Sequence, residues 1–246
     1  MDERERLIDR IRRVLAEEQY AAGERIGSER ALADELGVTR SELRGALEPL
    51  EQEGAIRRSM GRTGGVFAWD GKIERQLNAI EGVPAMLRRQ GFAAETTVLL
   101  AGMTIADPSE TRALRLGDGE SVFRLRRRRT ANGVPLSIDE MTIPTRLVPG
   151  IQAHTLTESM YGLLFCEYGI EPEAAEETID VASADAGQAG SLGIAVGDPL
   201  FEIRRITYDR AGAPFEYSRD LFRADRTRIT LRRSGPRWKR ASGTAG

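Results

Sequence analysis

Cysteine and histidine are nearly absent from this chain of 246 residues, which has only Cys166 and His154. A single cysteine cannot form a disulfide within the chain, and one cysteine with one histidine cannot supply the ligands of a structural zinc site. The sequence therefore excludes folds stabilised by disulfides or zinc, and it predicts no metal and no cofactor. We expect Cys166 to lie on the buried side of its helix, in the protein core.

Long apolar runs are also missing, because no stretch approaches the roughly 18 residues that a membrane-spanning helix needs. Residues 2–6 are charged, where a secretory signal would become apolar. We therefore expect a cytoplasmic protein with no membrane partner. The net charge is −2, and acids outnumber arginines over residues 1–70, so bulk charge does not indicate nucleic-acid binding.

Residues 7–47 contain three segments typical of helices. Apolar residues recur at helical spacing over 7–15, Ser28 can cap a short helix over 29–36, and Thr39 can cap a third helix. Gly37 separates the second and third helices, which predicts a helix-turn-helix. Because Pro49 lacks a backbone donor, we expect a kink or an early end near Glu48.

Two short strands are predicted after these helices, over 55–58 and 65–69, around a glycine-rich basic hairpin at 59–64. Such a hairpin beside a helix-turn-helix is a wing. In a winged helix the N-terminal turn of the third helix enters the major groove and the wing follows the DNA backbone. The residues expected to contact DNA are Thr39, Arg40, Ser41 and Arg44 on the helix and Gly61, Arg62 and Gly64 in the wing. The alternative is that the two helix arginines form only a solvated face.

Beyond Phe92 the pattern changes to strands, expected over 95–105, 122–130, 134–143, 177–182, 200–208, 215–222 and 228–231. Helices are expected between them over 108–116, 157–168 and 184–192. Hairpin sequences at 131–133 and 209–212 join adjacent strands. The fold class is therefore α+β, with a mostly antiparallel sheet. The expected domains are 1–70, a connector at 71–90, a sensor domain at 91–233 and a disordered basic tail at 234–246.

Two arginines are expected on the apolar face of one strand. Side chains alternate between the faces of a strand, so Phe123, Leu125, Arg127 and Arg129 share one face. A buried guanidinium needs a partner. The partner is either an internal carboxylate, from Asp139, Glu140 or Glu216, or a bound anion such as a carboxylate or a phosphate.

The N-terminal motifs resemble the GntR family of bacterial regulators. They are Gly23-Glu24-Arg25-Ile26-Gly27-Ser28-Glu29-Arg30, Leu36-Gly37-Val38-Thr39-Arg40, Leu43-Arg44 and Leu50-Glu51-Gln52-Glu53-Gly54. The resemblance adds Arg30 to the DNA-contacting residues. Ile26-Gly27 replaces the usual Leu-Pro, and Glu42 replaces a common small hydroxyl residue. An acid there can accept a hydrogen bond from cytosine, so the operator is expected to differ.

The C-terminal motifs resemble the UTRA sensor domain of the HutC subfamily, which has a chorismate-lyase-like fold. They lie at 127–139, 158–161 and 212–226. The resemblance implies a phosphosugar-type anion near Arg127, Arg129, Ser159 and the helix start at Gly82-Val83, where a helix N-terminus favours negative charge. It also implies that Asp139, Tyr161 and Glu216 face the rest of the ligand. Phe222 stands where such members often carry tyrosine. We expect Asp220 to be a charged strand end outside the pocket.

These patterns predict a homodimeric transcription regulator, most simply a repressor, which binds double-stranded operator DNA and responds to a small anionic effector. One alternative is a DNA-binding dimer with a vestigial, ligand-free sensor domain. Another is a lyase-like enzyme, but the sequence offers no nucleophile paired with a base and no cofactor loop. We therefore predict that the chain is not an enzyme.

Overall fold

The computed structural model describes residues 3–20, 23–59, 64–78 and 80–231. The chain divides into two compact units, Met1–Ile73 and Glu74–Gly246. The wing residues Gly61 and Arg62 and the expected tail at 234–246 lie outside the described residues. Within the described ranges, no helix has both the length and the apolar character needed to cross a membrane.

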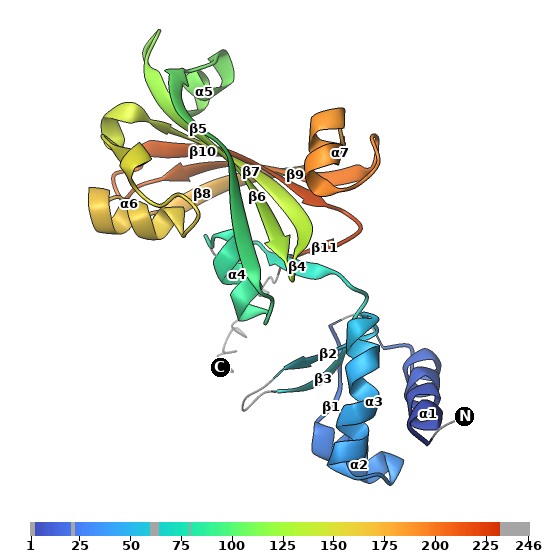
Figure 1. Ribbon diagram of the computed structural model, residues 1–246. Coiled ribbons are helices and arrows are strands. Elements are labelled where there is room, and N and C mark those ends of the chain that lie inside the picture. Colours follow the sequence, from blue (N-terminus) through green and yellow to red (C-terminus); the bar gives the residue numbers. More distant parts are fainter. Residues whose placement is uncertain (1–2, 21–22, 60–63, 79, 232–246) are drawn as a thin grey trace, which may run out of the picture. The chain divides into compact units, whose positions relative to one another are not determined.

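The first unit packs three helices around one apolar core (Figure 1). They are α1 (Glu3–Glu17), α2 (Glu29–Leu36) and α3 (Arg40–Gln52). Ser28 caps α2 by accepting a hydrogen bond from Ala31 N at 3.1 Å. Gly37 ends α2 with a φ of 67°, a left-handed conformation that glycine adopts without steric cost. The predicted helix-turn-helix is therefore present.

A three-stranded sheet completes this unit, in the order β1 (Arg25–Gly27), β3 (Gly65–Ala68) and β2 (Ile56–Ser59). The two strands of the predicted wing pair antiparallel, from Ile56 opposite Ala68 to Ser59 opposite Gly65. Strand β1 was not predicted from the sequence. A Cβ on Gly27 would lie 3.1 Å from Leu32 Cγ. Glycine at this position therefore lets the backbone pass close to the Leu32 side chain just before α2 begins.

The predicted early end near Glu48 is wrong, because α3 continues through Pro49 to Gln52. Proline at this position removes the hydrogen bond that the Gly45 carbonyl would accept from the residue four positions later. Arg4 on α1 replaces that donor, since its Nε donates to Gly45 O at 2.8 Å. A side chain from a neighbouring helix therefore satisfies the carbonyl that Pro49 leaves free.

The second unit is built on a six-stranded sheet in which every neighbouring pair is antiparallel. This arrangement confirms the predicted fold class. The strand order is β5 (Ala94–Ile105), β6 (Ser121–Ala131), β7 (Val134–Pro144), β10 (Pro214–Arg223), β9 (Pro199–Tyr208) and β8 (Ala174–Ser183). Asn132 and Gly133 join β6 to β7 with φ values of 51° and 76°, as the hairpin sequence predicts.

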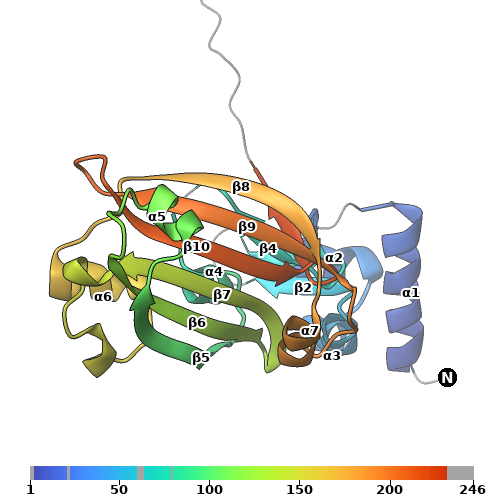
Figure 2. The same ribbon diagram turned by 90° about the horizontal axis from the view of Figure 1, so that it is seen from above.

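Helices cover both faces of this sheet (Figure 2). The inner face carries Leu125 and Met141 and packs against α6 (Met160–Tyr168). The outer face packs against α7 (Ala186–Leu192) through Ile138 and Leu221, and against the residues that follow α5 (Pro108–Ala113). Cys166 is exposed on α6, so its expected place in the core is wrong.

Two further elements precede the sheet in the chain. Strand β4 (Ile73–Gln76) pairs with β11 (Thr227–Thr230), and α4 (Val83–Arg89) follows β4. Two short 3₁₀ helices, Thr145–Leu147 and Ile151–Ala153, lie between β7 and α6. Much of the segment expected to be a connector therefore belongs to the second compact unit, through β4 and α4.

Candidate functional site

The N-terminus of α3 is organised by a reciprocal cap. The Thr39 hydroxyl accepts from Glu42 N at 3.3 Å, and Glu42 Oε2 accepts from Thr39 N at 2.7 Å. Hydrogen bonds from Thr39 lower the pKa of Glu42. Glu42 is therefore turned back onto its own helix. Its role in the helix cap explains why a glutamate occurs at position 42, and no contact with cytosine is needed to explain it.

Arg40, Ser41 and Arg44 are exposed near this helix start. Arg44 donates to Glu29 on α2 at 2.7 Å, whereas Arg40 has no side-chain partner among the described residues. A free guanidinium beside unpaired helix N–H groups suits a phosphate or the edge of a guanine. Arg40 is thus the residue of this turn that is most available to DNA.

The other expected DNA contacts lie around this turn and in the wing. Arg30 is exposed on α2, 3.9 Å from Asp34. Gly64 stands at the base of the wing, and its carbonyl accepts from Arg25 Nη2 at 3.0 Å. This bond ties the wing to β1. Gly61 and Arg62 lie outside the described residues.

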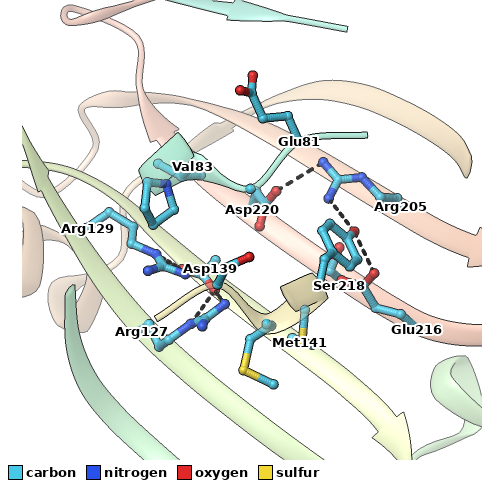
Figure 3. Close-up of a pocket in the computed structure, with 15 residues that line it drawn as sticks. Glu81, Val83, Arg127, Arg129, Asp139, Met141, Arg205, Glu216, Ser218 and Asp220 are labelled. Atoms are coloured by element: carbon cyan, nitrogen blue, oxygen red, sulfur yellow. Dashed lines mark hydrogen bonds and ion pairs between the residues drawn. The ribbon is translucent and has the colours of Figure 1, made fainter. Parts of the chain in front are cut away.

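The second candidate site is a cavity of about 40 Å³ on the inner face of the six-stranded sheet, which has room for a few water molecules. The starts of α4 and α6 cover it (Figure 3). Its lining includes eight of the expected effector residues: Gly82, Val83, Arg127, Arg129, Asp139, Ser159, Tyr161 and Glu216. Phe222 is fully buried on β10 but does not line the cavity.

Arg127 and Arg129 share a single carboxylate. Asp139 Oδ2 accepts from Arg127 Nε at 2.9 Å and Nη2 at 2.7 Å, and its Oδ1 accepts from Arg129 Nε at 2.8 Å. All three residues are buried. Burial lowers the pKa of Arg129, an effect that Asp139 opposes. An internal carboxylate, one of the two partners expected for the arginines, is therefore present, and the single carboxylate of Asp139 pairs with both guanidinium groups.

Strand β9 contributes a third buried arginine that the sequence analysis missed. Arg205 Nε donates to Glu177 at 2.6 Å, and its Nη1 donates to Tyr161 OH at 3.3 Å. Tyr161 in turn donates to Glu216 Oε2 at 2.7 Å. Burial and the charge of Glu216 raise the pKa of Tyr161, so the phenol stays protonated and remains a donor.

Asp220 lines the same cavity, which corrects its expected position outside the pocket. It lies directly opposite Asp139 across the pairing of β10 with β7. Burial first, and then the charge of Asp139, raise its pKa to about 6, although Arg205 and Arg75 oppose this shift. Ser218 lies two residues earlier on the same strand face and also borders the cavity.

Some of this site was visible in the sequence. Arg127 and Arg129 stood out because a dense arginine run crosses the faces of one strand. Arg205, Ser218 and Asp220 each occur singly in alternating strands, where a polar residue is as typical of a solvated face as of a pocket. Only the curvature of the sheet and the helices that cover it distinguish these cases.

A helix-turn-helix with a wing, joined to a sensor-like antiparallel domain, defines a DNA-binding transcription regulator. The family model described as bacterial regulatory proteins of the gntR family matches residues 3–66, and the UTRA domain model matches residues 89–228. The chain therefore belongs to the GntR family with a UTRA domain, as predicted, and it is a regulator rather than an enzyme.

Characterised relatives span nearly the same length. The transcriptional repressor NagR of Bacillus subtilis is 29% identical, with 81% of each chain covered. The repressor PhnF of Mycolicibacterium smegmatis is 30% identical, with 85% of each chain covered. The crystal structure of PhnF from Mycobacterium smegmatis superposes with a TM-score of 0.66 at 27% identity, covering 93% of this chain and 99% of that one.

Proposed function

We propose that this protein is a homodimeric transcriptional repressor which a small anionic effector releases from its operator. Helix α3 would enter the major groove through Arg40 and Ser41, with Arg30, Arg44 and the wing on the flanking phosphates. Operator DNA would place the working protein in the bacterial cytoplasm. Relatives named as repressors support the direction of regulation.

The observation that carries the effector proposal is the sharing of Asp139 by two buried arginines. One carboxylate neutralises only one guanidinium, so Arg127, Arg129 and Asp139 together carry one net positive charge at this end of the cavity. Burying an unpaired charge is costly. A carboxylate or phosphate of an effector would supply the missing negative charge and accept hydrogen bonds from both arginines.

The size of the cavity supports a coupling to DNA binding. An effector larger than a few water molecules has to separate the starts of α4 and α6 from the sheet. Helix α4 follows β4, and β4 follows the DNA-binding unit along the chain. A ligand that binds only the opened arrangement therefore biases the segment through which the two units are joined.

The test is a screen of the full-length protein by thermal shift against inorganic phosphate, phosphorylated sugars and small carboxylates, followed by release of promoter DNA in gel shifts. Arg127→Ala should keep DNA affinity within about twofold but abolish both the thermal shift and the release.

Arg126→Ala is the matched control, because Arg126 is the neighbouring residue on the outer face and pairs with Glu140 at 3.1 Å. Normal release in the Arg127→Ala variant would contradict the proposed site. A protein that binds its promoter but no anion of the panel would favour the vestigial sensor instead.

A further inference from the structure

The cavity beneath α4 and α6 has two ends of opposite charge. At the basic end, Asp139 is the carboxylate that forms ion pairs with both Arg127 and Arg129. Arg129 directs Nε to Asp139 and Nη1 to Thr96. Its Nη2 has no hydrogen-bond partner among the described residues. This end therefore carries an excess of one positive charge and a donor that is free for a ligand.

The acidic end carries the reverse excess. Three carboxylates gather around two guanidinium groups: Asp220, Glu216 and Glu177 around Arg205 and Arg75. Glu81 also lines the cavity but is paired with Arg89 at 2.6 Å. These three carboxylates and two guanidinium groups together carry one net negative charge, next to the net positive charge of the basic end.

Asp220 is the carboxylate at this end that accepts no hydrogen bond from any residue in the described part of the chain. Its side chain is 8% exposed and borders the cavity. Its ion pair with Arg205 Nη2 is 3.5 Å long, and that nitrogen makes no hydrogen bond to any residue that the structure describes. Asp139, one strand away, accepts three hydrogen bonds. Nearly all buried carboxylates receive donors, so Asp220 is prepared for a donor that the protein does not supply.

Ser218 provides a second unsatisfied group at the same place. Its hydroxyl is buried and makes no hydrogen bond with any described residue. It shares a face of β10 with Asp220 and Glu216, and all three border the cavity (Figure 3). A hydroxyl and a carboxylate to which no described residue is hydrogen-bonded therefore lie side by side at the edge of the cavity.

We infer that the effector is bifunctional, with an anionic group held by Arg127 and Arg129 and an ammonium group held by Asp220 and Ser218. Neighbouring strands are about 4.8 Å apart. Arg127 on β6 and Asp220 on β10 are separated by β7, so their backbones lie about 10 Å apart. Their side chains stand on the same face of the sheet, so a short chain or a single sugar ring spans the distance between the two groups.

An ammonium group suits this end better than a neutral hydroxyl. A hydroxyl would satisfy the hydrogen bonds of Asp220 but leave the excess negative charge in place. An ammonium group supplies three donors and the missing positive charge together. The inference rests on the proposed anion site and adds the chemistry of the opposite end of the ligand.

The experiment measures binding of ω-aminoalkyl phosphates of increasing chain length to the full-length protein, each beside the alkyl phosphate and the ω-hydroxyalkyl phosphate of equal length. Calorimetry at millimolar ligand should show that the best amine binds about tenfold or more tightly than both partners. Asp220→Asn should remove that advantage while leaving alkyl phosphate binding within about twofold.

Asp180→Asn, an exposed change on β8, is the matched control and should keep the advantage of the amine. Circular dichroism and melting temperature establish that Asp220→Asn is folded, and Ser218→Ala should reduce the same advantage independently. Alkyl phosphates that bind through Arg127 with no gain from the amine would overturn the bifunctional ligand but keep the proposed function. Failure of every probe to bind would overturn both.

Discussion

Gly45 lies in the interior of α3, where glycine is about 1 kcal/mol less favourable than alanine. A Cβ at this position would meet only Arg4 Nε, at 4.0 Å. Gly45→Ala should therefore raise the free energy of unfolding of the N-terminal unit by about 1 kcal/mol, measured by urea titration. Gly37→Ala is the control with the opposite sign, because a φ of 67° strains any other residue by about 1 kcal/mol. Equal effects of the two changes would contradict this assignment.

Asp220 should give the ligand-free protein an unusual dependence on pH. Because its pKa in the fold is about 6, above its unfolded value, its contribution to stability is fully present below about pH 4 and is lost as the pH rises through 6. The groups facing it are Arg205, Arg75, Asp139 and Glu216. The free energy of unfolding of the wild type should therefore fall by on the order of 2 kcal/mol between pH 4 and pH 7 because of this group, and Asp220→Asn should abolish that fall.

The measurement is the difference in unfolding free energy between the wild type and the Asp220→Asn variant across that range. Asp225→Asn is the control, because a hydrogen bond from Arg223 lowers the pKa of Asp225. Its contribution is therefore present at neutral pH and disappears on acidification. A pH-independent difference for Asp220→Asn would show that Asp220 keeps an ordinary pKa.

At the scale of elements, the start of α3 makes a sharp prediction. Arg40→Ala should weaken binding to promoter DNA by tenfold or more, because one good arginine contact to a base contributes about 1 to 3 kcal/mol. Fluorescence anisotropy at several salt concentrations measures this loss. Arg12→Ala removes the same charge from α1, where Arg12 pairs with Glu53 at 2.7 Å, and should change affinity little. Equal losses in both variants would indicate only bulk electrostatics.

Elements with a clear period, or beside a recognisable turn, were predictable from sequence, and two short strands without such a signal were not. The helix-turn-helix and the long antiparallel strands follow from capping residues, alternation and the Asn132-Gly133 turn. Strands β1 and β4, of three and four residues, pair only with strands distant in sequence, so no hairpin turn beside them indicates a strand. Pro49 misled the prediction because the donor that replaces its missing N–H comes from Arg4, distant in sequence, so no local pattern could reveal it.

At the scale of the whole molecule, we expect a dimer. Two recognition helices on a pseudo-palindromic operator require two copies. Strand β5 lies at an edge of the sheet and leaves Leu100, Met103 and Ile105 exposed, an apolar surface that monomers usually cover. Sedimentation velocity of the full-length protein should give a single species of twice the chain mass. A strict monomer at micromolar concentration would contradict the symmetric operator.

The pairing of β4 with β11 has a consequence for how such regulators diversify. Strand β4, which begins at the boundary of the second unit, pairs with β11, the last strand that the structure describes, so the two ends of this unit are joined within the described residues. Recombination upstream of β4 could therefore exchange the DNA-binding unit while leaving the sensor domain intact. In protein engineering, the same boundary offers a splice point for chimeras in which one ligand controls a different set of genes.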